Sequence, residues 1–96
     1  MELERHGDTL TVRCRRDFNL MTVRHLLHHV EDAQRVRVDL SRARIVDTEA
    51  VMALHELEQN GLKVTLLEPP SIFYELLEVL QLESHFDIER LVERPR

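Results

Sequence analysis

The 96-residue sequence is poor in the residues that mark several classes of protein. Its single cysteine, Cys14, excludes an internal disulfide and a cysteine-rich zinc site. Three phenylalanines, one tyrosine and no tryptophan leave few rings on which nucleic-acid bases could stack. Only Gly7 and Gly61 are glycines, and the sequence has none of the glycine-rich loops that hold phosphates in nucleotide-binding folds. The composition therefore argues against disulfide-rich, zinc-finger and nucleotide-binding proteins.

Long hydrophobic runs are also missing. The longest ones contain only a few residues, whereas a helix that crosses a bilayer needs roughly 20. The N-terminal sequence MELERHGD carries too many charges for a signal peptide. We therefore expect a soluble, cytoplasmic protein that does not insert into a membrane.

Positive charge is scarce in the second half of the chain. The formal net charge is −5, of which residues 1–44 contribute +2 and residues 45–96 contribute −7. Nucleic-acid binding requires a basic surface that neutralises phosphates, so we expect no nucleic-acid partner. The length fits a single domain spanning residues 1–96 with one modest core, which excludes a large multidomain enzyme.

Apolar residues alternate with polar ones in three regions, as in β-strands with one buried face. The first region, residues 2–14, is interrupted by Gly7-Asp8, and a glycine at the first position of a two-residue loop suits a type II′ hairpin turn. The other regions are residues 36–40 and 62–66. The residues expected on the buried face are Leu10, Val12, Cys14, Val36, Val38, Leu40, Leu62, Val64 and Leu66. Those expected on the opposite face are Thr11, Arg13, Arg35, Arg37, Lys63 and Thr65.

Three further regions have the apolar spacing of three and four residues that is typical of helices. The first covers residues 20–30, with Asn19 placed to cap its N-terminus. The second opens at residues 47–49 and ends before Gly61, where a left-handed residue is expected. The third follows two prolines and covers residues 72–80. The chain then continues with a short apolar segment at residues 86–88 and a polar tail at residues 89–96.

The alternation within the strands also favours one architecture. A parallel sheet covered by helices on both faces would have continuous apolar strands, but each strand here has a polar side. We therefore predict an α/β fold in which the helices lie mostly on one face of a small sheet. A doubly wound nucleotide-binding fold is disfavoured.

Three histidines, His25, His28 and His29, lie within the first expected helix, and His25 and His29 share one face of it. Zinc normally takes three or four protein ligands, and neither a cysteine cluster nor an H-E-x-x-H motif is present. A polar helix face explains the group better than a metal site or an enzyme built on it, which we keep as a minor alternative. His55 and His85 are interpreted as isolated histidines.

Catalytic chemistry has no evident set of residues in this sequence. Ser41, Ser71 and Ser84 lack the strand-to-helix turn of a nucleophile elbow. Cys14 lies among alternating apolar residues, which indicates a buried, inert thiol. We therefore predict that the protein is not an enzyme and that it has no cofactor and no metal.

A family resemblance emerges at residues 38–51. These residues, VDLSRARIVDTEAV, run from a strand that ends in Asp-Leu through a short loop to Asp-Thr at a helix start. They resemble the core motif of STAS domains, the family that contains the bacterial anti-sigma factor antagonists. Residues 77–86 are similar to the family's second landmark, a helix that leaves through Gly-Leu toward a final strand, and residues 18–20 fit its Leu-Asp-Leu start of the first helix. The resemblance covers nearly the whole chain and implies a small mixed β-sheet with interleaved helices.

The resemblance implies a bacterial protein-protein interaction module that regulates transcription by partner switching. Thr48 stands where phosphorylatable members have the Ser or Thr that a partner kinase modifies, and Asp47 matches the preceding acid. The implied partner is an anti-sigma factor or a serine/threonine kinase-like regulator. Met52 and His55 are expected on the outward side of the same helix. The predicted partner-binding residues are Asp47, Thr48, Glu49, Met52 and His55.

Three positions depart from the family pattern. Glu49 replaces a small residue, Ala50 replaces a glycine, and Gln81 replaces the glycine of the Gly-Leu pair. Gln81 is therefore expected to adopt a left-handed conformation at a cost of roughly 1 kcal/mol.

A phosphate on Thr48 would add about −1.5 to −2 charges near the positive end of the helix dipole. Repulsion from Asp47 and Glu49 would offset part of that gain, so phosphorylation is expected to change partner binding more than fold stability. Asp-Thr-Glu before an apolar helix is also an ordinary capping sequence, and this alternative stays open. So do a homodimer and a non-phosphorylated STAS subunit or scaffold, for example of a lipid-transport ATPase complex.

Overall fold

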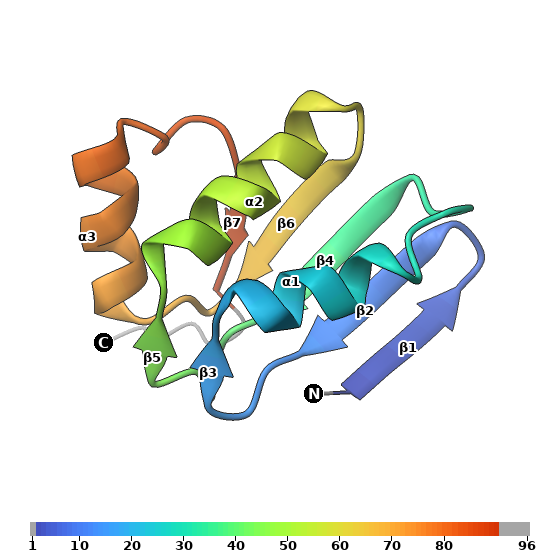
Figure 1. The fold of residues 1–96 in the computed structure, drawn as a ribbon, viewed down its shortest axis with the longest axis horizontal. Helices are drawn as coiled ribbons and strands as arrows, with labels where there is room; N and C mark the ends of the chain where they lie inside the picture. Colours follow the sequence, from blue (N-terminus) through green and yellow to red (C-terminus); the bar gives the residue numbers. More distant parts are fainter. Residues whose placement is uncertain (1, 91–96) are drawn as a thin grey trace.

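The computed structural model describes residues 2–90 (Figure 1). Five strands form one sheet in the order β1-β2-β4-β6-β7. Their bounds are β1 (Glu2–His6), β2 (Thr9–Arg13), β4 (Arg35–Asp39), β6 (Lys63–Leu67) and β7 (Asp87–Glu89). The remaining elements are the short paired strands β3 (Asp17–Phe18) and β5 (Ile45–Val46) and the helices α1 (Leu20–Leu27), α2 (Thr48–Gln59) and α3 (Ser71–Leu80). Residues 91–96 of the predicted polar tail lie outside the described residues.

The five-stranded sheet is mixed, with one antiparallel edge. β1 runs antiparallel to β2, whereas β2, β4, β6 and β7 are parallel neighbours. Parallel neighbours require crossover connections, and each one here contains a helix. In Figure 1, α1 and α2 lie in front of the sheet, and α3 packs beside α2. The predicted α/β fold, a small mixed sheet with interleaved helices mostly on one face, is confirmed.

The sheet face that meets the helices carries the apolar residues predicted for it. All of them are buried except Leu62, which is half-buried against the same core. Alternation explains this result because successive side chains of a strand point to opposite faces. Val23 and Leu26 of α1, Leu54 of α2 and Phe73 of α3 fill the space above the sheet. One hydrophobic core therefore joins all three helices to the sheet.

Cys14 belongs to this core. Its side chain is buried, and burial raises the pKa of the thiol to about 11, with a smaller contribution from the nearby carboxylate of Asp39. At this pKa the thiol stays protonated at neutral pH. The thiolate, which is the reactive form of a cysteine, is therefore scarce. The predicted burial of the cysteine is confirmed.

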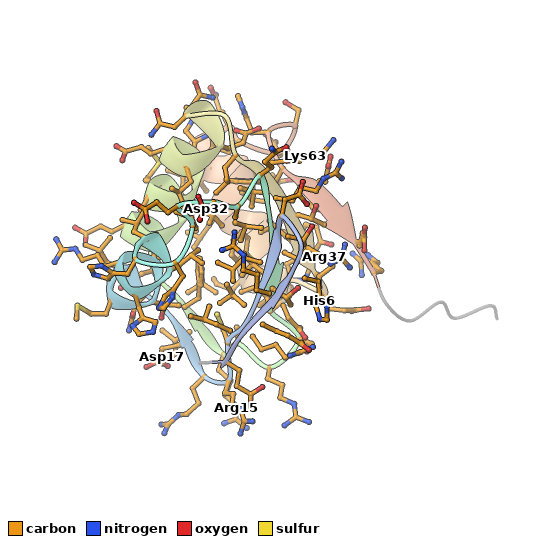
Figure 2. The ribbon with its side chains drawn as sticks, turned by 90° about the vertical axis from the view of Figure 1, so that its right-hand side faces the viewer. His6, Arg15, Asp17, Asp32, Arg37 and Lys63 are labelled. Atoms are coloured by element: carbon orange, nitrogen blue, oxygen red, sulfur yellow. The ribbon has the colours of Figure 1, made fainter. Side chains whose placement is uncertain are left out.

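The opposite sheet face carries charged side chains and, among the described residues, no helix. Figure 2 shows Arg37 and Lys63 on the side of the sheet away from α1 and α2. The Nη2 atom of Arg37 lies 3.1 Å from Oε1 of Glu89, and Nζ of Lys63 lies 3.9 Å from Oδ2 of Asp87. These exposed pairs contribute little stability, but they leave the face polar and solvated, as the alternation predicted.

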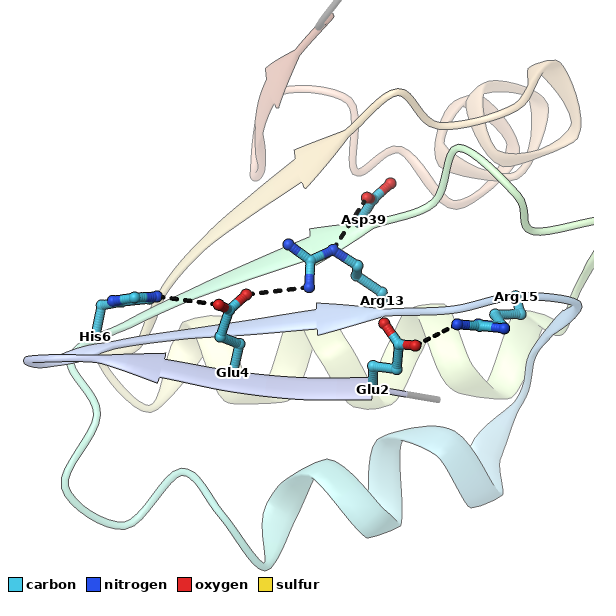
Figure 3. A network of polar contacts seen from close by, with 6 residues as sticks. All are labelled: Glu2, Glu4, His6, Arg13, Arg15 and Asp39. Atoms are coloured by element: carbon cyan, nitrogen blue, oxygen red, sulfur yellow. Dashed lines mark hydrogen bonds and ion pairs between the residues drawn. The ribbon is translucent and has the colours of Figure 1, made fainter.

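The β1–β2 hairpin extends this charged face (Figure 3). Arg13 donates from Nη1 to Oε1 of Glu4 at 3.1 Å, and its Nε lies 3.9 Å from Oδ2 of Asp39. Nε2 of His6 lies 3.3 Å from the other Glu4 oxygen. Hydrogen bonds with His6 and with Arg13 lower the pKa of Glu4. The favourable effect on folding is therefore present above the ordinary carboxylate pKa and is lost as the pH falls.

The predicted turns and caps agree with the structure except at the end of α1. Gly7 opens the hairpin turn at φ 62, as a type II′ turn requires, and the Asn19 carboxamide accepts the Thr22 N–H at 3.0 Å. The first helix, predicted to extend to residue 30, ends at Leu27. There the amides of His28 and His29 donate hydrogen bonds to the carbonyls three residues earlier instead of four. This tightens the last turn and ends the helix.

The helices α2 and α3 end in the same hydrogen-bond pattern as each other, but a different type of residue occupies the left-handed position in each. After α2, the amides of Gly61 and Leu62 donate to Glu58 and Leu57; after α3, those of Gln81 and Leu82 donate to Glu78 and Leu77. Both patterns are Schellman motifs, which need a left-handed residue. Gly61 has φ 104, and Gln81 has φ 59 and ψ 42, so the predicted left-handed glutamine is confirmed.

Replacing Gln81 by glycine is therefore expected to raise the free energy of unfolding by about 0.5–1 kcal/mol, because glycine occupies this region without a Cβ clash. Urea denaturation measures the change. The reciprocal substitution, Gly61→Gln, is the matched control and is expected to destabilise the protein. Stabilisation by Gly61→Gln, or a loss with Gln81→Gly, would contradict this account of the two motifs.

Candidate functional site

Backbone hydrogen bonds to a neighbouring loop hold the start of α2. The amides of Arg44 and Ile45 donate to the Arg16 carbonyl at 2.7 and 3.2 Å, and the amide of Asp47 donates to the Phe18 carbonyl at 2.9 Å. These bonds continue the pairing of β3 with β5. Two-residue strands have too little periodicity to be recognised in a sequence, so this small sheet was missed. It fixes the backbone from which α2 begins.

The buried side of α2 determines which of its side chains face solvent. Ala50, Val51 and Leu54 are completely buried against the core. Because a helix turns through 3.6 residues, these positions leave the first residues of α2 and Met52 facing outward. Met52 is 42% exposed, which confirms the predicted outward position.

The three residues Asp47, Thr48 and Glu49 are all exposed at this helix start. Asp47 is the N-cap residue, with an extended backbone (φ −92, ψ 136), but its carboxylate makes no capping hydrogen bond. Within residues 2–90, neither that carboxylate nor the Thr48 hydroxyl has a hydrogen-bond or ion-pair partner. Ordinary capping therefore accounts for the backbone of Asp47 and leaves its side chain available.

An exposed apolar residue also borders this acidic start. Ile45 is 60% exposed, although it lies in β5 next to the partly buried Val46. Sequence reasoning missed it, because Ile45 and Val46 are equally apolar and only the β3–β5 pairing shows which one faces the core. Together with Met52, Ile45 gives the helix start apolar surface among charged groups.

Four arginines form a basic rim before α2. Arg15, Arg16, Arg42 and Arg44 line a solvent-open hollow between the loops that follow β2 and β4. In Figure 2, Arg15 lies at the end of the sheet, next to the charged face. Arg15 pairs with Glu2, whereas the other three have no ion pair among the described residues. The sequence did contain a sign of this basic rim, because two arginine-rich segments directly follow predicted strands. The net charge of that half of the chain did not reveal it, since acidic residues elsewhere cancel most of the arginines.

His55, which was predicted to face outward as an isolated residue, lies elsewhere. Its side chain is only 18% exposed and is turned toward the loop between α3 and β7. The rings of His55 and His85 are 4.8 Å apart, and Phe86 lies at 6.4 Å. Both expectations are therefore wrong, because periodicity within α2 carries no information about a loop that folds back over it.

The three histidines near the end of α1 remain a surface group. The rings of His25 and His29 are 5.2 Å apart, and His28 is the C-cap residue that follows α1. In the described part of the chain, these side chains do not bring three potential metal ligands together. The minor alternative of a metal or catalytic site built on them therefore has no geometric support.

The described residues include no helix that is both long and apolar enough to span a bilayer.

Comparison with solved structures places this chain in the STAS-like fold class, as the resemblance of its motifs predicted. One of the matched structures is that of the anti-sigma factor antagonist SpoIIAA in its unphosphorylated form. The two share 16% sequence identity and superpose with a TM-score of 0.73, over 96% of this chain and 88% of the SpoIIAA chain. No protein-family model and no curated protein sequence matches. At this identity the likeness establishes the fold.

Proposed function

We propose that this protein regulates a partner protein by binding it through the start of α2, in the manner of an anti-sigma factor antagonist. The observation that carries the proposal is the exposure of Asp47, Thr48 and Glu49 on a backbone held by the β3–β5 pairing. An available carboxylate and an available hydroxyl at a rigid helix start can be recognised without rearrangement of the fold. The STAS-like fold supports this choice of surface.

The chemistry of the surface defines a complementary partner. The partner would place apolar side chains against Ile45 and Met52 and basic groups against Asp47 and Glu49. Exclusion of water by the apolar centre would strengthen the charged contacts at its rim. The partner is an anti-sigma factor or a serine/threonine kinase-like regulator, and the described chain by itself is a binding module rather than an enzyme.

Phosphorylation of Thr48 would switch this contact. In that step the Thr48 oxygen forms a bond to the γ-phosphorus of ATP held by the kinase, the bond from that phosphorus to ADP breaks, and the hydroxyl proton is released. The phosphate would add about −1.5 to −2 charges between Asp47 and Glu49. Local repulsion limits its gain from the helix dipole, so the modification acts mainly on the docked partner.

Intact mass spectrometry tests the switch. After incubation with ATP and any serine/threonine kinase-like regulator that is found encoded near this gene, the wild-type chain is expected to gain one phosphate and Thr48→Ala none. Ser71→Ala is the matched control, since Ser71 is also an exposed first residue of a helix, α3. A phosphate on Thr48→Ala, or the absence of one from Ser71→Ala, would show that the modified residue is not Thr48. If the wild-type chain is neither modified nor bound by the kinase, the switch is refuted.

Glu49 favours a second candidate, in which the protein binds constitutively. Its carboxylate is exposed and already places a permanent negative charge beside Thr48. A STAS-like subunit or scaffold, for example of a lipid-transport ATPase complex, would use the same surface without modification. Binding of such an ATPase with unchanged affinity by Thr48→Ala, together with no phosphate on the wild-type chain, would select this candidate.

A further inference from the structure

A second group of chemically active side chains lies at the other end of α2. His55 and Glu58 are one helical turn apart on α2, and His85 comes from the loop that connects α3 to β7. The Nδ1 atoms of His55 and His85 lie 3.5 and 3.7 Å from the same atom, Oε1 of Glu58. One potential ligand atom from each residue lies within 4.8 Å of the other two. Two imidazoles and a carboxylate therefore converge on one point.

The atoms that converge are not satisfied within the protein. Nδ1 of His55 and Oε1 of Glu58 are both buried, and neither has a hydrogen-bond partner. Leaving a buried donor or acceptor unpaired costs free energy, so such atoms in a folded protein call for an explanation. Separations of 3.5 and 3.7 Å are too long for good hydrogen bonds, whereas ligands that share a metal ion are held apart by it.

We propose that His55, Glu58 and His85 form a binding site for a divalent transition metal ion, with zinc as the best match. Tetrahedral ligands about 2.0–2.1 Å from zinc are about 3.4 Å from one another, close to the two separations on Glu58. Imidazole nitrogens suit zinc and its neighbours in the first transition row rather than magnesium or calcium, which prefer oxygen ligands. The group needs only small side-chain movements to close around an ion.

The surroundings leave a fourth coordination position open. A solvent-open hollow adjoins the group and is lined in part by Glu58, Ser84 and His85. Water can therefore complete a four-coordinate zinc, which is the arrangement expected when the protein supplies three ligands.

The ligands are supported by the core beneath them. Leu54 and Leu57 are buried on the inner side of α2, while Leu82 and Phe86 are buried on either side of His85. This packing holds both the helix and the loop, so that their imidazoles meet without the metal. A bound ion would then join α2 to the loop that leads into the edge strand β7. The inference is independent of partner binding at the start of α2.

Calorimetric titration of the metal-free full chain with Zn²⁺ tests the site. One ion is expected to bind per chain, and the thermal unfolding midpoint is expected to rise by several degrees, since a ligand that binds only the folded state stabilises it. His85→Asn and Glu58→Gln are each expected to weaken zinc binding by about 100-fold or more, because loss of even an outer-sphere partner costs about 10–100-fold.

The matched control removes the exposed histidines of α1. The double substitution His25→Ala and His29→Ala is expected to leave zinc affinity unchanged. Co²⁺ is expected to give the intense visible absorption of a four-coordinate ion in the wild-type chain and in this control, without a thiolate band because Cys14 is buried. Circular dichroism of the metal-free variants separates loss of a ligand from loss of the fold.

Three results would overturn the proposal. The first is the absence of stoichiometric zinc binding to the wild-type chain. The second is binding that survives unchanged in folded His85→Asn and Glu58→Gln. The third is binding abolished by the α1 substitutions, which would place the ion on His25 and His29.

Discussion

Phe73→Ala is expected to lower the free energy of unfolding by about 3–5 kcal/mol. Phe73 projects from α3 and is 0% exposed, and its ring centroid lies 5.8 Å from that of Phe18, which is also buried. Truncation removes the transfer free energy of the ring and leaves a cavity between α3 and the β3–β5 pair. Since small domains have about 5–15 kcal/mol of stability in total, this is a large share.

Urea denaturation followed by circular dichroism measures this loss. Val79→Ala is the control on the same helix, because Val79 is 77% exposed, and its effect is expected to stay within about 0.5 kcal/mol. Equal effects of the two substitutions would mean that Phe73 does not anchor α3 to the core. Because Phe18 leads directly into α1, Phe73→Ala also tests whether α3 supports the segment that holds the start of α2.

Met52→Glu is expected to weaken binding of the partner by about 30-fold or more. Met52 is the exposed apolar residue on the outward side of α2, between the acidic start and the middle of the helix. A glutamate there would bring a charge into the apolar centre of the proposed interface, without a partner and with a desolvation cost. Glutamate is also a good helix former, so the fold should tolerate the change.

Titration of the candidate regulator with labelled protein gives the dissociation constant. Val79→Glu introduces the same charge at an exposed valine on α3 and is expected to leave the affinity unchanged. Unchanged urea midpoints would show that both variants are folded. If Met52→Glu binds as tightly as the wild-type chain, the interface does not include this face of α2. The basic rim formed by the four arginines then becomes the surface to test.

Local patterns were enough to predict most of the fold. The alternation through Val36, Val38 and Leu40 identified both a strand and its buried face. Gly7 and Asn19 identified a turn and a helix cap, because each has a conformational or hydrogen-bonding property that acts within a few residues. The family resemblance added the prediction that Gln81 is left-handed, since it stands where the family has a glycine after a helix, and this is confirmed.

The candidate site was predictable only in part. The sequence located Asp47, Thr48 and Glu49 at a helix start, because the change from polar to apolar spacing is local. It did not reveal that the Asp47 carboxylate makes no capping hydrogen bond to the helix, nor that Ile45 is exposed. The exposure of Ile45 depends on the pairing of β3 with β5, which joins segments far apart in the chain.

The sequence by itself determined the three helices apart from the end of the first, the longer strands, their buried faces and the position of Thr48, since periodicity, caps and turns act over a few residues. Only the tertiary structure brought His85 to His55 and Glu58 and placed the arginines of two loops around one hollow. The physical reason is that these groups meet through the packing of a shared core, in which residues remote in sequence become neighbours. No spacing along the chain records that proximity.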